Sequence, residues 1–143
     1  MPATSRVSLN QIFTVNIEIA AGAQQVDGGA AYLNFDTGKL RVVDAGGAPA
    51  SAIDAGSSLP TALQNFANNP DGRIDYAAGA GLQGGTPPTG TFILASIRFK
   101  AIATTGEGGT PVVFVSDLPR KTDATRAGGS VLGTVTGGVV IVQ

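Results

Sequence analysis

Alternating apolar and polar residues define the clearest element of this chain. In the segment Ile12–Ala20, Phe13, Val15, Ile17 and Ile19 fall on one face of an extended strand, and mainly polar side chains fall on the other. This two-residue period is typical of a strand that buries one face and exposes the other to solvent. We therefore predict a strand over 12–20.

The same period recurs along the rest of the chain. It predicts strands over Ala30–Phe35, Leu40–Asp44, Arg73–Ala78, Thr91–Ala103, Pro111–Ser116 and Val139–Gln143. In the strand 30–35, the side chains of Ala31, Leu33 and Phe35 are expected to point inward, and those of Tyr32 and Asn34 outward. In the longest strand, the expected inward set is Ile93, Ala95, Ile97, Phe99 and Ala101. Several short strands in succession indicate an all-β fold.

One segment carries a helical pattern instead. Ser58 is a favourable N-cap, Pro60 suits the first helical turn, and Leu59, Leu63 and Phe66 recur at helical spacing. This local pattern predicts one short helix over residues 58–67.

Composition agrees with an all-β fold of one domain. The chain has 143 residues, of which 21 are Gly and 8 are Pro, while 43% are hydrophobic. Many turns between short apolar strands are typical of a sandwich or barrel, and the length suits one domain over 1–143. The abrupt polar start at Met1–Ala3 suggests a domain excised from a larger protein. No apolar stretch reaches the roughly 18 residues that span a bilayer, so we expect no membrane insertion.

The residue inventory argues against an enzyme. The chain contains no Cys, His or Trp, so thiol nucleophiles, imidazole bases and the usual zinc ligands are missing. The net charge is -1 and charged residues make up 13%, which argues against nucleic acid as a partner. We expect no catalytic residues, no cofactor and no metal site in this chain.

The individual polar motifs also have simple structural interpretations. Asp71-Gly72 resembles part of a calcium loop, but Ala67 and Ala78 occupy positions where oxygen ligands are needed. We predict a hairpin turn there and a turn capped by Asp36 after the strand 30–35. The group Arg120, Lys121 and Arg126 is interpreted as a solvated basic loop.

The order of the motifs resembles the cohesin domain of cellulosomal scaffold proteins. The matching pieces include Phe13-Thr14-Val15, Phe35-Asp36 ahead of Leu40-Arg41-Val42-Val43, and Ile97-Arg98-Phe99-Lys100-Ala101. The resemblance covers nearly the whole chain. It implies a nine-stranded β-sandwich with jelly-roll topology on a secreted or surface-attached bacterial or archaeal protein. It also implies a non-catalytic module that binds a dockerin module of another protein, with any calcium held by the dockerin.

The resemblance further implies that the partner packs on one flat sheet face. Its strands here would be Ala30–Phe35, Leu63–Asn68, Arg73–Ala78 and Val112–Ser116, so the second of these competes with the helix predicted locally. The residues expected at this face are Ala30, Tyr32, Asn34, Asn69, Arg73, Asp75 and Ala77. By position, the family's polar and acidic anchors fall at Gly28, Ala30, Asn69 and Gly81, none of which is acidic. A less charged binding surface is therefore expected.

Two alternative functions stay open at this point. The first is a carbohydrate-binding or adhesin module, which would need exposed aromatic side chains on which a polysaccharide stacks, or calcium bound in a loop. Tyr32, Tyr76 and Phe92 are the candidates, although aromatic residues make up only 6% of the chain. The second is a structural spacer domain of a cell-surface protein. Separately, recognition of a partner through loops such as Gly79–Pro88, or through Arg120 and Lys121, would make binding by the sheet face wrong.

Overall fold

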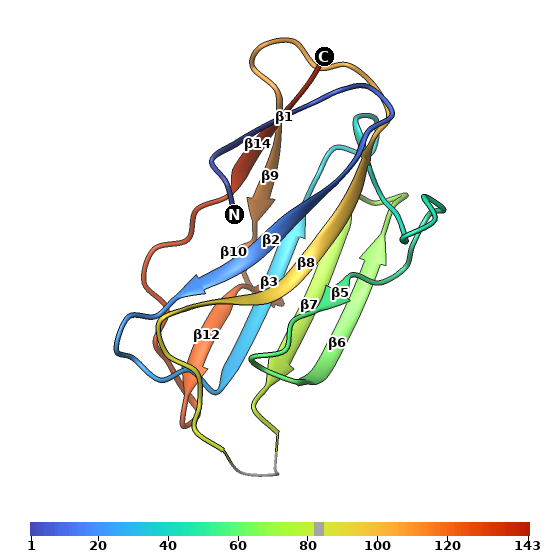
Figure 1. Cartoon of the computed structure of the whole chain (residues 1–143). Coiled ribbons are helices and arrows are strands. Elements are labelled where there is room, and N and C mark those ends of the chain that lie inside the picture. The colour runs from blue at the N-terminus through green and yellow to red at the C-terminus, as the bar shows by residue number, and fades with distance from the viewer. Residues whose placement is uncertain (82–84) are drawn as a thin grey trace.

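The computed structural model describes residues 1–81 and 85–143, which form two β-sheets packed face to face (Figure 1). The larger sheet contains eight strands: β1 (Thr4–Val7), β3 (Gly28–Asn34), β6 (Thr61–Asn68), β7 (Arg73–Gly79), β9 (Thr110–Phe114), β12 (Asp123–Arg126), β13 (Gly129–Ser130) and β14 (Gly138–Val142). In this sheet β6 lies at one edge and pairs with β7, and β7 pairs with β3. The strand β3 pairs on its other side with β9 and then with β12.

The smaller sheet consists of β2 (Ile12–Ala20), β4 (Leu40–Val42), β5 (Asp54–Ala55) and β8 (Thr91–Ala101). A separate two-stranded hairpin, β10 (Ser116–Asp117) with β11 (Arg120–Lys121), interrupts the chain between β9 and β12. Among the described residues, β1 and β14 pair in parallel and the other strand pairs are antiparallel. The predicted all-β sandwich is confirmed.

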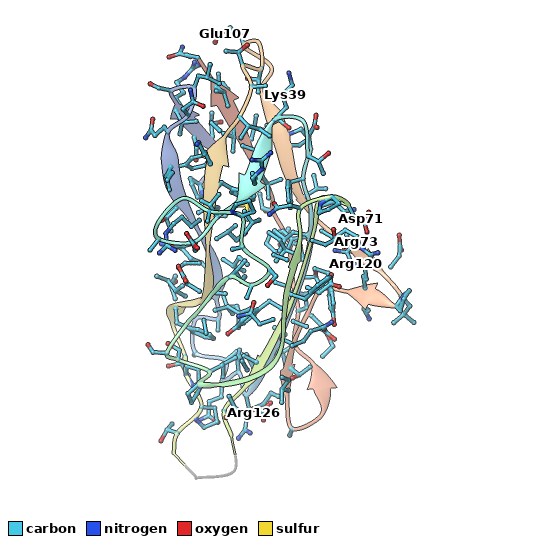
Figure 2. All side chains as sticks on the ribbon, turned by 90° about the vertical axis from the view of Figure 1, so that its right-hand side faces the viewer. Lys39, Asp71, Arg73, Glu107, Arg120 and Arg126 are labelled. Atoms are coloured by element: carbon cyan, nitrogen blue, oxygen red, sulfur yellow. The ribbon has the colours of Figure 1, made fainter. Side chains whose placement is uncertain are left out.

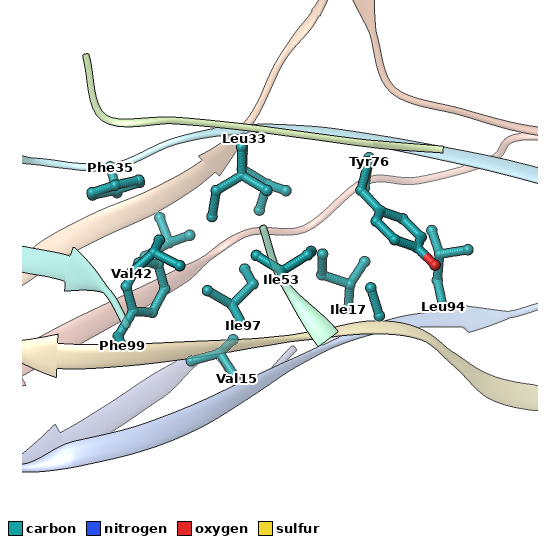
Figure 3. Packing of buried hydrophobic residues seen from close by; sticks show 14 of the residues in the cluster. Val15, Ile17, Leu33, Phe35, Val42, Ile53, Tyr76, Leu94, Ile97 and Phe99 are labelled. Atoms are coloured by element: carbon teal, nitrogen blue, oxygen red, sulfur yellow. The ribbon is translucent and has the colours of Figure 1, made fainter. Parts of the chain in front are cut away.

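The core lies between the two sheets (Figure 3). Val15, Ile17, Ile97 and Phe99 from the smaller sheet face Leu33, Phe35 and Tyr76 from the larger sheet and the turn beside it. The Phe99 ring packs against Phe35 at 5.3 Å between ring centroids and against Phe13 at 6.0 Å. Burial of these alternating positions is the main source of stability for the fold.

The inward phase predicted for 91–103 is wrong at its start. Ala95, Ile97, Phe99 and Ala101 are buried as expected, but Ile93 is 40% exposed while Phe92 and Leu94 are buried. The register between β2 and β8 shifts beside Ile17, where one extra β8 residue is accommodated. Such a bulge moves the residues beyond it to the opposite face, and strict alternation in the sequence does not reveal it.

The short helix predicted over 58–67 is also wrong. Leu59 is buried in the loop before β6, whereas Leu63 and Phe66 lie on a strand and are exposed. Pairing with β7 provides hydrogen-bond partners for the backbone of this segment. The register shift between Ala62 and Gln64 interrupts the strict alternation of inward and outward side chains. Tertiary pairing therefore overrides the helical spacing, and the strand implied by the family resemblance is confirmed.

The described chain contains fourteen strand segments, where the resemblance implies nine. The difference comes from short pieces of two to four residues, such as β5, β10, β11 and β13, that interrupt or flank the main strands. No helix in the described ranges is long and apolar enough to cross a membrane. The predicted turn is confirmed at Asp36, whose carboxylate accepts a hydrogen bond from the Gly38 amide at 2.8 Å.

Candidate functional site

Six of the seven residues predicted for the binding face lie together on the outer side of β3 and β7. The antiparallel register places Ala30 opposite Ala77, Tyr32 opposite Asp75, and Asn34 opposite Arg73. Their neighbours Ala31, Leu33 and Ile74 point to the core, so the six side chains share the other face of the sheet. Strand alternation therefore placed these six side chains on one outward surface, as expected, and their role in binding a partner stays a prediction.

Asn69, the seventh residue, has a different position. It lies in the turn between β6 and β7, and its side-chain amide is used inside the fold. The Val42 amide donates to Asn69 Oδ1 at 2.7 Å, and Asn69 Nδ2 donates to the carbonyls of Val42 and Ala50. These bonds tie the turn to the smaller sheet, so the Asn69 amide groups are not free for a partner.

The edge strand β6 contributes residues that the predicted helix concealed. Gln64, Phe66 and Asn68 stand opposite Ala77, Asp75 and Arg73 and extend the same face by one strand. The Tyr32 hydroxyl donates to Gln64 Oε1 at 3.0 Å across β7. No period-two signal marks this strand in the sequence, because the outward Phe66 is apolar and the inward Asn65 is polar. Only the family resemblance indicated a strand here.

Apolar side chains are concentrated on the outer edge of this surface. Leu63 is 73% exposed and Phe66 is 46% exposed. Leu63 is the extra residue between the pairs Ala62–Ala78 and Gln64–Ala77, as in a β-bulge. Together with the half-buried Tyr32, these residues form a mixed apolar and polar surface on a rigid sheet.

The Arg120 guanidinium binds the centre of the face. Its Nε donates to Asp75 Oδ1 at 2.7 Å, and its Nη1 donates to Asn34 Oδ1 at 2.7 Å. Its Nη2 donates to the Leu33 and Ile74 carbonyls, and the group lies 5.9 Å from the centre of the Tyr32 ring. The side chains of Arg120 and Asp75 are only 12% and 13% exposed, so this ion pair is well shielded from water.

The interpretation of Arg120, Lys121 and Arg126 as a solvated basic loop is therefore wrong for two of the three. Arg126 pairs with Asp27 at 2.8 Å. The backbone amide of Ala127 and the Arg126 side chain both donate to the Asp27 carboxylate and hold its pKa below the usual value. Both arginines find their carboxylates on distant segments, so proximity in sequence could not show the pairing.

Two of the three aromatic candidates for sugar stacking are in the core. Tyr76 is fully buried, and burial raises the pKa of its hydroxyl. Phe92 is also buried, as a consequence of the bulge in β8. Tyr32 and Phe66 are left on the candidate face. They stand in the same cross-strand row with Asp75 between them, which does not make a continuous aromatic platform.

The turn at Asp71 has the predicted hairpin geometry. The Asp71 amide donates to Asn68 Oδ1, the Asn68 amide group donates to Asp71 Oδ2, and Gly72 has a positive φ of 65°. These bonds account for Asp71 and Gly72 through their usual roles in turns. Within residues 1–81 and 85–143, no cluster of three acidic side chains could hold a metal ion.

A cavity of about 550 Å³ opens between the sheets, beside β2, β12 and the segment 131–136. Its described walls are mainly aliphatic, and their carboxylates are Glu18 and Asp123. Asp123 Oδ1 already accepts a hydrogen bond from Ser130 Oγ at 2.6 Å, which joins β12 to β13. Because this carboxylate has a structural partner, we place the candidate site on the open face of β3, β6 and β7.

Two packed sheets with an open, rigid outer face define the chain as a β-sandwich module. A family model described as the cohesin domain matches residues 2–141. The chain belongs to the cohesin domain family. In a comparison with curated proteins, no sequence matched.

Solved structures support the same fold. The third cohesin of ScaC from Acetivibrio cellulolyticus, in complex with the ScaB dockerin, superposes with a TM-score of 0.74 at 21% identity, covering 98% of this chain and 94% of that one. CaCohA2 from Clostridium acetobutylicum gives 0.74 at 14% identity and covers 97% and 86%. The seventh ScaB type I cohesin from Pseudobacteroides cellulosolvens gives 0.68 at 22% identity and covers 96% and 86%.

Proposed function

We propose that this chain is a non-catalytic interaction module that binds a dockerin module through the outer face of β3, β6 and β7. We call this surface the binding face and define it by Ala30, Tyr32, Asn34, Leu63, Gln64, Phe66, Arg73, Asp75 and Ala77. Membership of the cohesin family supports the proposal, as does the similar fold of a cohesin solved in complex with a dockerin. Residues 1–143 act as one module in this proposal, on a secreted or surface-attached bacterial or archaeal protein.

The observation that carries the proposal is the exposed apolar edge of the binding face. Leu63 and Phe66 expose much of their side chains on a strand whose backbone is fixed by pairing with β7. Protein interfaces concentrate aromatic and aliphatic anchors within a polar rim. Here Tyr32 and Phe66 are the anchors, and Gln64, Asn34 and Arg73 supply the polar surroundings.

Electrostatics should contribute little to this interface. Asp75 is neutralised by Arg120, and no acidic side chain occupies the positions of the family's anchors. An interface with few uncompensated charges depends only weakly on ionic strength. Raising the salt concentration should therefore change the affinity only slightly.

Calorimetric titration with a panel of dockerin modules tests the proposal. The parent should bind at least one of them, and Tyr32→Ala should weaken that complex by about 2 kcal/mol or more, which is about 30-fold in affinity. Ile93→Ala is the control, because it also truncates a large side chain at a solvent-accessible position but lies on β8 of the other sheet, outside the binding face. The control should bind like the parent.

Other outcomes would favour the alternatives. Binding of a polysaccharide that is lost in Tyr32→Ala, without binding of any dockerin, would indicate a carbohydrate-binding module. A parent that binds neither class of ligand would indicate a structural spacer. If substitutions in the loop 79–88 abolish dockerin binding while Tyr32→Ala does not, recognition belongs to the loops; residues 82–84 of that loop lie outside the described ranges.

A further inference from the structure

The hairpin β10–β11 stands out from the larger sheet on the side of the binding face (Figure 2). It begins and ends within the same sheet, since Val115 donates its amide to the Tyr32 carbonyl and Thr122 donates its amide to the Val115 carbonyl. Its second strand, β11, lies against β3. The hairpin therefore lies beside β3, next to Tyr32, and projects from the outer face of the sheet.

One side chain, Arg120, connects the hairpin to the binding face. Arg120 makes hydrogen bonds to Asp75, to Asn34 and to two main-chain carbonyls, and its guanidinium lies near the Tyr32 ring. The planar group reaches across β3 to β7, so it fixes β11 relative to two strands at once. An arginine with several donors in fixed directions suits this role better than a lysine, which carries a single ammonium group.

The tip of the hairpin exposes an apolar side chain. Leu118 is 83% exposed, which makes it the most exposed large hydrophobic residue among the described positions. Leu63, at 73%, comes next and lies at the opposite edge of the binding face. A single exposed leucine has no special meaning. These two, however, lie at opposite edges of one surface, so a partner that covers the whole surface would contact both.

We propose that Arg120 is a positioning residue that holds the hairpin β10–β11 upright, so that Leu118 contacts the same dockerin module that packs on the binding face. This inference rests on the proposed function and adds a second contact region to it. In this arrangement the dockerin module packs on β3, β7 and β6, and one side of it contacts the hairpin. Leu118 supplies contact energy, whereas Arg120 acts through the position of Leu118.

The proposal predicts energetic coupling between the two residues. Leu118→Ala removes an exposed side chain, so it should leave the unfolding midpoint unchanged and weaken the dockerin complex about tenfold. Arg120→Met should weaken the complex by at least as much, because the hairpin loses its fixed position. In the Arg120→Met background, the further change Leu118→Ala should cost less than about threefold, since a displaced hairpin no longer delivers Leu118.

Two further measurements separate positioning from a general loss of structure. Hydrogen exchange of the free protein should accelerate at the amides of 116–121 in Arg120→Met, while β2 and β8 keep their protection. Arg120→Lys should not restore the affinity, because a lysine cannot make the same set of bonds to Asp75, Asn34 and the carbonyls. Leu9→Ala, a change at another exposed leucine distant in sequence from the hairpin, is the control and should bind like the parent.

The results distinguish this inference from the proposed function. If the parent binds a dockerin and Leu118→Ala binds equally well, the hairpin is outside the interface and only the present inference is wrong. If the losses from Leu118→Ala and Arg120→Met add without coupling, Arg120 does not act through the hairpin. If the parent binds no dockerin at all, the proposed function is wrong and the partner assigned to the hairpin is wrong with it.

Discussion

Phe99→Ala probes the packing between the two sheets most directly. Phe99 is fully buried near the C-terminal end of β8, opposite Phe13 on β2. Its ring also meets Phe35, which directly follows β3 of the other sheet, in an edge-on arrangement. The substitution therefore removes a side chain that links both layers. Its neighbours are held by paired strands and cannot readily fill the space.

The expected loss follows from this geometry. Replacing a buried Phe by Ala costs about 3–5 kcal/mol, because the transfer energy of the ring is lost and a cavity is left behind. Two aromatic contacts, each worth about 0.5–1.5 kcal/mol beyond the buried area, place the value for Phe99 in the upper half of that range. We expect about 4 kcal/mol.

Denaturant titration followed by circular dichroism measures this loss. The midpoint should fall while the slope of the transition stays the same, which identifies a change in stability rather than in compactness. The control Ile93→Ala lies on the same strand with its side chain exposed, so it should cost less than about 1 kcal/mol. A loss below about 1 kcal/mol for Phe99→Ala would refute the assignment of this face of β8 to the core.

Three further predictions concern single groups. Because the Ala127 amide and Arg126 lower the Asp27 pKa, stability should fall as the pH drops below the ordinary value of 3.8, and acid titration of Asp27→Asn should show a smaller fall. Burial raises the Tyr76 pKa above 10.0, so the parent should lose stability in alkaline titration above that pH, and Tyr76→Phe should lose less. Gly109→Ala should lower the thermal midpoint more than Gly106→Ala: both glycines have positive φ, but only the Cβ added at position 109 would meet Val139.

Strand alternation was sufficient to predict most of the core. Val15, Ile17, Leu33 and Phe99 are buried as the two-residue period requires, because each lies on a strand with one face toward the opposite sheet. The prediction failed at Ile93, where a bulge reverses the phase. A bulge depends on how two strands fit together, and nothing in the sequence of either strand marks it.

The candidate site was predictable only where its residues lie on regular strands. Tyr32 and Asp75 were placed correctly because each alternates with core residues on its own strand. Leu63 and Phe66 were missed because their spacing also fits a helix, and the competition was decided by pairing with β7. Arg120 was missed for another reason: its partners Asp75 and Asn34 are 45 and 86 residues away, so only the folded chain brings them together.

Binding of a dockerin through the outer face of β3, β6 and β7 can be tested directly by mapping the contact surface with nuclear magnetic resonance. Unlabelled dockerin is added to isotope-labelled protein, and the shift of each backbone amide is followed. We expect the largest shifts on β3, β6 and β7, centred on Tyr32, Phe66 and Asp75, and smaller shifts on β2 and β8. Shifts confined to the β2–β8 sheet or to the segment 131–136 beside the cavity would contradict binding through this face.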